Sequence, residues 1–405
     1  MHPLLADRLL LRYFETPLLY DIISEDTWEL DEEAFTLFQY FTGHHSIEQI
    51  AKKLGVQEEK IKEIVKEFGP ELILNKHAIT SPVQFQVPHT LVPSLRAVLI
   101  HITSACNLTC RHCYLQKGEL LHLEPALFHS AVQQLDDLQG LKVLISGGEP
   151  LLHPKVFEML HSIQPNKLRK ILLTNGLLID ASKATRLKGL IHEVQISLDG
   201  IKSHNNFRNH PLAFDKSVQS IKHLTHAGLE VSVATMIHSQ NLEELEELES
   251  ILKDLEVKSW ALDVPSKTGA FLDNPDLNPP LEEAGAALRR YGWGAPLEDT
   301  HSTYACGAHL CAVMPNGDVA KCGFFADKPV GNLNQTSLSD CWRLVQKNYI
   351  WEQKELECAK LKCPHLGDCR GGCRFRASVE TNSRYGIDPV KCAAFNFKNS
   401  RRSDA

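Results

Sequence analysis

The sequence lacks a long apolar run: none of its 405 residues belongs to an uninterrupted apolar stretch of the roughly 18 residues that a membrane-spanning helix needs. It also lacks a basic segment followed by an apolar core at its start, an internal repeat and a low-complexity tract. Acidic residues outnumber basic ones by 50 to 43, so there is no excess of positive charge for a nucleic-acid backbone. These absences predict a cytoplasmic globular protein that binds neither membrane nor nucleic acid.

Charge is unevenly distributed along the chain. Residues 1–90 contain 8 Lys and Arg but 15 Asp and Glu, which gives this segment the whole net charge of −7. Residues 77–94 contain three prolines and no charged side chain, which predicts an extended linker. We therefore expect an acidic domain at residues 1–76, which would repel phosphate groups.

This first domain alternates short apolar runs with helical patterns. RLLLRY, LLYDIIS and TWEL predict three strands, and three helical stretches follow before a closing ELIL strand. Ser46 and Gln49 predict a capping box at the second helix. The order is typical of a winged-helix-like domain. Because the segment is acidic, we expect an exposed strand edge that accepts an extended peptide rather than a DNA-binding surface.

Residues 95–265 alternate apolar strands with helical stretches. The six predicted strands are RAVLIHIT, KVLIS, KILLT, EVQISL, EVSVATMI and KSWALDV. Six such units predict an α/β fold with a parallel sheet and helices outside it. Chemistry in these folds collects where the strands end. Residues 266–300, rich in proline and glycine at their centre, form a bridging region before a third domain at residues 301–405.

The 12 cysteines are the strongest chemical signal. Without a secretion signal, they indicate metal ligation or catalysis rather than disulfides. Three of them follow the first predicted strand at C-x3-C-x2-C spacing, and we call these the first cysteine set (Cys106, Cys110, Cys113). Their spacing suits a [4Fe–4S] cluster with one open iron, or a zinc ion. Zinc would need a fourth ligand, for which His101 and His112 are candidates.

Four motifs in order resemble the radical S-adenosylmethionine (SAM) superfamily: CNLTCRHCY, then ISGGEP, TNG and SLDG. The resemblance implies a partial (β/α)6 barrel in which the first cysteine set holds a [4Fe–4S] cluster that binds the methionine part of SAM. It implies that the GGE motif contacts the methionine amino group, that residues at the third and fourth strand ends contact the ribose, and that a histidine lies near the adenine. The implied SAM-binding residues are Gly147, Gly148, Glu149, Asn175, Ser197, Asp199 and His112.

The third domain resembles a SPASM domain, a cysteine-rich iron–sulfur domain that holds two auxiliary [4Fe–4S] clusters. A G-x4-C motif and a C-x5-C-x3-C run carry the resemblance, whereas C-x4-C at Cys358 departs from the family's C-x2-C. One cluster would be held by the second cysteine set (Cys306, Cys311, Cys322, Cys373). The other would be held by the third cysteine set (Cys358, Cys363, Cys369, Cys392). Cys341 is left over and is expected to be a small buried side chain. From the cysteines alone, two tetrathiolate zinc sites are the alternative.

SPASM relatives mostly modify peptides, and the first domain resembles the PqqD-like peptide-recognition domain of ribosomal-peptide maturases. The resemblance thus implies three clusters and an enzyme that uses SAM to modify a precursor peptide with a leader segment, forming a thioether, a carbon–carbon crosslink or a decarboxylated product. Flavodoxin or ferredoxin would be the reductant. Gly323 stands where the sulfatase-maturing branch has an acidic base, which argues against that branch. Two alternatives stay open: a radical SAM enzyme of tetrapyrrole or other cofactor synthesis, and a non-catalytic iron–sulfur electron carrier.

Overall fold

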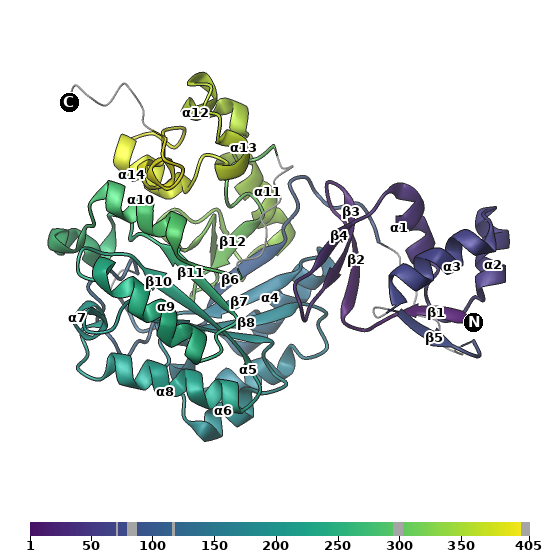
Figure 1. Cartoon of the computed structure of the whole chain (residues 1–405), viewed down its shortest axis with the longest axis horizontal. Coiled ribbons are helices and arrows are strands. Elements are labelled where there is room, and N and C mark those ends of the chain that lie inside the picture. The colour runs from purple at the N-terminus through teal and green to yellow at the C-terminus, as the bar shows by residue number, and fades with distance from the viewer. Residues whose placement is uncertain (70–71, 79–86, 116–117, 295–302, 398–405) are drawn as a thin grey trace. The chain divides into compact units, whose positions relative to one another are not determined.

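A computed structural model describes residues 1–69, 72–78, 87–115, 118–294 and 303–397 (Figure 1). Its contacts divide the chain into two compact units. The first unit consists of residues 1–96 with the short segments 136–141 and 167–169, and the second unit contains the rest of the chain.

The first unit combines two small antiparallel sheets with three helices. One sheet pairs β1 (His2–Leu5) with β5 (Leu72–Asn75). The other contains β2 (Leu9–Tyr13), β3 (Pro17–Asp21) and β4 (Thr27–Glu29), in that order. The helices are α1 (Glu32–Phe38), α2 (Ile47–Leu54) and α3 (Glu58–Glu67). Their apolar faces enclose one core, in which Phe38, Phe41, Ile50 and Ile61 are fully buried.

Local sequence accounts for most of these elements. At the start of α2, Ser46 Oγ accepts from the Gln49 backbone N–H while Gln49 Oε1 accepts from the Ser46 backbone N–H, so the predicted capping box is present. Gly55 ends this helix with φ +68°, a left-handed conformation that glycine adopts without strain. The three helices and the four predicted strands of this domain are confirmed. Among the described strands of this unit, β1 was the one not predicted, because it is defined by its pairing with the distant β5.

In the second unit, nine strands form one sheet in the order β11-β10-β9-β8-β7-β6-β12-β13-β14. The six predicted strands are β6 (Ala97–His101), β7 (Lys142–Ser146), β8 (Arg169–Thr174), β9 (Glu193–Ser197), β10 (Glu230–Met236) and β11 (Ser259–Asp263). They lie in chain order. The pairs β6–β7, β8–β9, β9–β10 and β10–β11 are parallel. Strand residues such as Val98, Val143, Leu172 and Val194 are fully buried, as in parallel sheets that are covered on both faces.

Helices alternate with these strands, so the predicted α/β fold is confirmed. They are α4 (Pro125–Asp137), α5 (Val156–Ser162), α6 (Ala181–Leu187), α7 (Ser203–Arg208), α8 (Ala213–His226) and α9 (Leu245–Asp254). Short 3-10 turns lie at Pro150–Leu152, Leu242–Glu244, Gly269–Asp273, Pro275–Leu277, Gly323–Phe325 and Gln353–Glu355. The four strands β6 to β9 end next to one another, which places the four predicted motifs at one edge of the sheet.

The cysteine-rich end extends this same sheet. β12 (Leu310–Val313) pairs in parallel with β6, and β13 (Asp318–Ala320) and β14 (Gly331–Asn332) follow antiparallel. The remaining helices are α10 (Leu281–Arg290), α11 (Leu338–Tyr349), α12 (Glu357–Lys360), α13 (Leu366–Cys369), α14 (Arg374–Thr381) and α15 (Pro389–Ala394). Cys341 lies on α11 and is fully buried, as expected. No helix in the described ranges is long and apolar enough to cross a membrane.

Candidate functional site

The first cysteine set lies on the loop that follows β6, and the GGE turn after β7 holds this loop in place. The Gly148 backbone N–H donates to Thr103 O at 2.7 Å, and that of Glu149 donates to Ala105 O at 2.7 Å. A Cβ atom on Gly148 would lie 2.3 Å from Ala105 O, and one on Gly147 would lie 2.5 Å from Thr103 O. The two glycines are therefore required by the close approach of two backbone segments, a reason that the sequence did not show.

The Glu149 side chain is fully buried and joins the end of β7 to the end of β8. Its carboxylate accepts from Thr174 Oγ1 at 2.7 Å, from the Asn175 backbone N–H at 2.9 Å and from the Leu151 backbone N–H at 3.1 Å. Burial raises the pKa of Glu149, and these three hydrogen bonds oppose that shift. Three donors leave room for one further donor on the two oxygens, such as an ammonium group.

Asn175 and Ser197, which the resemblance implies as SAM-binding residues, differ in the hydrogen bonds of their side chains. The Asn175 side chain donates from Nδ2 to Asn107 Oδ1 at 2.8 Å and accepts from the Leu177 backbone N–H at 2.9 Å. It thereby ties the end of β8 to the cysteine loop. Ser197 ends β9 and is half-buried. Within the described ranges its hydroxyl has no hydrogen-bond partner, so it can bind a ligand.

Asp199 is engaged in a buried ion pair that the sequence did not predict. Arg208 donates from Nε to Asp199 Oδ2 at 2.5 Å, and the Met236 backbone N–H donates to Oδ1 at 2.8 Å. Burial alone would raise the pKa of Asp199, but Arg208 beside it lowers the pKa to about 2. Arg208 Nη1 lies 3.9 Å from Cys110 Sγ, so this arginine reaches the first cysteine set. In the sequence Arg208 stands nine residues after Asp199, at the end of the next helix, and the pair is recognisable only in the fold.

His112 belongs to a stack of three rings, in which Phe207 and His238 are fully buried and His112 is half-buried. The His112 and Phe207 ring centroids are 4.0 Å apart with an interplanar angle of 3°, and those of Phe207 and His238 are 4.0 Å apart at 9°. Burial lowers the pKa of His112 to about 3 and that of His238 to about 4, so both rings are neutral. His112 Nδ1 and His238 Nε2 are buried and have no hydrogen-bond partner among the described residues. Unpartnered polar atoms beside the cysteine loop fit a ligand with polar groups.

His101, the other candidate for a fourth zinc ligand, faces Tyr114. Tyr114 Oη lies 3.4 Å from His101 Nε2. A Cβ atom on Gly323 would lie 2.8 Å from Tyr114 Oη and 3.1 Å from His101 Nε2. The space for a side chain after Cys322 is therefore already filled, in keeping with the absence of an acidic base there.

Members of the second cysteine set gather around a buried lysine. Lys321 is 4% exposed, and its hydrogen-bond partners in the described part of the chain are the backbone oxygens of Gly307 and of Leu310, the latter at 3.0 Å. Burial lowers the pKa of Lys321 to about 8, while the nearby Cys322, Cys311 and Cys306 thiols raise it. Cys373 of this set caps α14, where its Sγ lies 3.5 Å from the Arg376 backbone N–H.

The third cysteine set lines one pocket. All four members contribute to its wall, together with His365, Phe395 and Phe397. Cys358 stands on the short helix α12, and the Cys363 backbone N–H donates to Cys358 O at 3.0 Å. This turn brings the two thiols to the same pocket despite their four-residue spacing.

Thiolate ligands would balance buried positive charges in the cysteine-rich end. Lys321 and Arg374 are buried cations whose hydrogen-bond partners in the described ranges are carbonyl oxygens, and the ionisable groups near both include cysteines. A buried cation is stabilised by anionic groups around it. Cluster-bound thiolates would supply them near Lys321 and would add to the Asp388 carboxylate near Arg374. In the described part of the chain, no three His, Cys, Asp or Glu side chains lie close enough to hold a single metal ion.

The chain belongs to the radical SAM superfamily, whose family model matches residues 100–252. It is a radical SAM enzyme, and membership implies a [4Fe–4S] cluster and SAM as cofactors. The AdoMet-dependent heme synthase of Methanosarcina barkeri is 30% identical to it over 340 residues, which cover 73% of this chain and 95% of that protein. The antilisterial bacteriocin subtilosin biosynthesis protein AlbA of Bacillus subtilis is 25% identical over 327 residues, covering 75% of this chain and 71% of that protein.

The fold of this chain is also similar to that of a solved structure. Streptococcus suis SuiB, in a crystal structure with its precursor peptide SuiA, aligns with a TM-score of 0.69 and 16% identity. The alignment covers 95% of this chain and 98% of SuiB, so it includes most of the first unit. The shared fold thus extends over nearly the whole chain.

Proposed function

We propose that this enzyme is a radical SAM maturase that modifies a ribosomally made precursor peptide. The observation that carries the proposal is the open edge of β4 in the first unit. Peptide-linked relatives such as AlbA, and the fold shared with SuiB over most of the chain, support it.

Among the described residues, β4 is an edge strand with backbone groups available for pairing. Trp28 faces Leu19 of β3, and bonds from Asp21 N to Asp26 O (3.0 Å) and from Leu30 N to Pro17 O (2.9 Å) fix the ladder. The alternation of an antiparallel ladder therefore points the N–H and C=O groups of Thr27 and Glu29 toward the open edge. An extended leader peptide would add there as a further strand.

Aromatic side chains lie beside this edge. Trp28 and Phe68, the C-cap residue of α3, are both half-buried, and their ring centroids are 6.2 Å apart. They offer apolar contacts for alternate side chains of an added strand. The segment is acidic, which disfavours a phosphate backbone as its partner.

The cysteine sets would hold three [4Fe–4S] clusters, the first set holding the one that binds SAM. When bound, that cluster and SAM supply the 5′-deoxyadenosyl radical that abstracts a substrate hydrogen. The chain's own residues orient SAM: Glu149 accepts from its ammonium group, the Ser197 hydroxyl bonds the ribose, and the neutral His112 ring lies against the adenine. Arg208 places a positive charge beside Cys110 and keeps Asp199 ionised. A flavodoxin or ferredoxin would deliver the electron.

The test is incubation of the reconstituted enzyme with SAM, dithionite and the peptide encoded beside its gene. We expect 5′-deoxyadenosine together with a mass change in the peptide. The second candidate function, tetrapyrrole synthesis, is favoured by the 30% identity with a heme synthase. An iron coproporphyrin assayed in parallel separates the two, because turnover of the tetrapyrrole with an unchanged peptide would contradict the peptide proposal.

A further inference from the structure

Arg374 is a buried arginine without a carboxylate among its hydrogen-bond partners in the described ranges. It is 3% exposed. Its Nη1 donates to Gly386 O at 2.9 Å and Arg384 O at 3.2 Å, Nε donates to Gly372 O at 3.3 Å, and Nη2 donates to Gly371 O. Carbonyl dipoles orient the guanidinium but do not neutralise it, so its charge acts on the groups around it.

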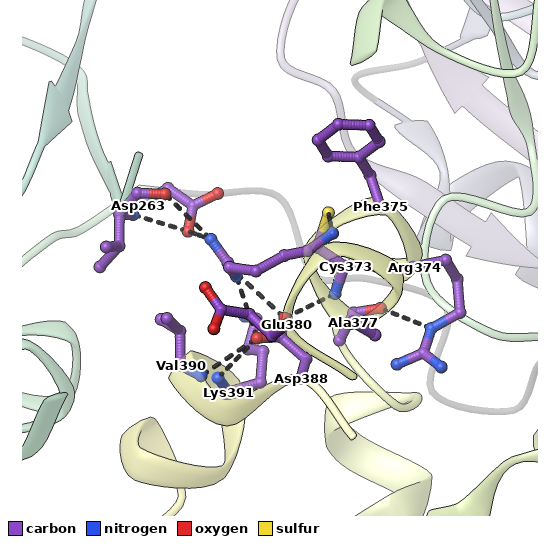
Figure 2. Close-up of polar contacts among 12 residues, drawn as sticks. Asp263, Cys373, Arg374, Phe375, Ala377, Glu380, Asp388, Val390 and Lys391 are labelled. Carbon is purple, nitrogen blue, oxygen red and sulfur yellow. Dashed lines mark hydrogen bonds and ion pairs between the residues drawn. The ribbon is translucent and has the colours of Figure 1, made fainter. Parts of the chain in front are cut away.

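Arg376, which lies on helix α14 as Arg374 does, is paired directly with carboxylates. It donates from Nε to Asp388 Oδ1 at 2.9 Å, from Nη2 to Asp388 Oδ2 at 3.1 Å and from Nη1 to Asp263 Oδ1 at 2.8 Å. Figure 2 shows Asp263 at the upper left, Asp388 below the centre and the Arg374 side chain at the right, away from both. Two carboxylates therefore balance Arg376, and Arg374 has no such direct pair.

The ionisable groups near Arg374 include cysteines from two different sets. Its electrostatic neighbours are Asp388, Cys358 of the third set, and Cys373 and Cys306 of the second set. Burial raises the pKa of Cys358 to about 11, and Arg374 is among the groups that oppose this shift. The guanidinium is thus within electrostatic range of both sets.

The position of the Arg374 side chain is fixed by the turn that bears Cys369 and Cys373. Its head group bonds to Gly371 and Gly372 of that turn. A Cβ atom on Gly371 would lie 2.2 Å from a Leu356 methyl group and 3.3 Å from Arg374 Nη2. The charge is therefore held against the backbone segment that joins the second set to the third.

We propose that Arg374 is a charge-compensating residue shared by the two auxiliary clusters, and that it raises the reduction potentials of both. This inference rests on the clusters in the proposed function. A [4Fe–4S] cluster gains one negative charge when it is reduced, and a nearby fixed positive charge favours the more negative form. Lys321 is the comparison, because its cysteine neighbours all belong to the second set.

The experiment uses the full chain with Cys106, Cys110 and Cys113 replaced by alanine, so that only the auxiliary clusters remain. Iron content and redox titrations followed by electron paramagnetic resonance are measured after anaerobic reconstitution. We expect Arg374→Gln to shift both midpoint potentials to more negative values and Arg374→Lys, which keeps the charge, to shift them less. Lys321→Met should shift one potential only. The matched control is Arg384→Gln, an exposed arginine of the same domain whose charge is screened by water.

Unchanged potentials in Arg374→Gln with full iron content would overturn the inference, as would an equal shift in Arg384→Gln. If Arg374→Gln loses its iron, the result for Arg374→Lys tests the inference. Retained iron in Arg374→Lys, with midpoint potentials near those of the parent variant, would support a role of the positive charge. Loss of iron in Arg374→Lys would overturn the inference. Fewer than roughly eight iron in the parent variant would instead contradict the auxiliary clusters themselves, and with them both the proposed cofactors and this inference.

Discussion

At the residue scale, Glu149 has two roles that can be separated. In Glu149→Ala the three donors that now bond to the carboxylate become buried and unsatisfied, which costs about 1–3 kcal/mol of unfolding free energy. SAM binding should weaken about tenfold or more, because a charge-assisted hydrogen bond is lost. Glu149→Gln should weaken binding with a smaller loss of stability. Thermal unfolding and equilibrium dialysis measure the two effects, with the exposed Glu243→Ala as control. A change in affinity below about threefold would contradict contact with SAM.

Asp199 and Arg208 give a second prediction at this scale. Because the pKa of Asp199 is lowered from 3.8 to about 2, the ion pair stabilises the fold fully above about pH 4. This stability, roughly 2 kcal/mol, is lost as the pH falls from 4 toward 2. Urea unfolding of the apoprotein at several pH values should show Asp199→Asn less stable than wild type at pH 6 and closer to it at pH 3. A difference that is constant with pH would contradict the pair.

At the element scale, the approach of β7 to the cysteine loop predicts a steric effect. Gly148→Ala places a methyl group against the Ala105 carbonyl, which is backbone and cannot rotate away. The loop must shift, and we expect loss of about four iron per chain and of SAM cleavage. Gly118→Ala is the matched control, because a Cβ there meets no atom within 4 Å. Iron content equal to that of the control would show that the loop tolerates the shift.

The β4 edge gives another prediction at the same scale. Thr27→Pro removes an N–H that points to the open edge and leaves the ladder with β3 in place. Peptide affinity should fall while SAM cleavage continues, so 5′-deoxyadenosine forms with little modified peptide. Thr27→Ala keeps the N–H and should bind peptide normally. Binding by fluorescence anisotropy and product analysis measure both, and equal peptide modification by the two variants would contradict strand addition.

Sequence patterns predicted elements well where the information was local. The apolar runs of β6 to β11 and the cap at Ser46 depend on neighbouring residues, and they are confirmed. Pairings between distant segments were missed: β1 is recognisable only beside β5, and β12 only beside β6. The same holds for the site, where the cysteine spacing was visible but the Asp199–Arg208 pair and the His112 stack required the fold.

At the scale of the whole molecule, the three cysteine sets predict the total metal content. After anaerobic reconstitution we expect roughly 12 iron per chain. Replacing the first cysteine set by alanine should remove about four iron and all SAM cleavage, because the other two sets lie on separate elements of the cysteine-rich end. Iron and acid-labile sulfide assays measure this. Retained cleavage in that variant would contradict the assignment of the SAM cluster.

The parallel pairing of β12 with β6 has a consequence for synthesis on the ribosome. β6 emerges first among the strands of its sheet, yet the partner for one of its edges, Leu310–Val313, is translated only after the other five parallel strands. Until then this edge of a nascent chain offers unpaired N–H and C=O groups to any other extended chain. In products of premature termination before residue 310, this edge of β6 would stay unpaired. Such fragments would be prone to aggregate or would depend on chaperones.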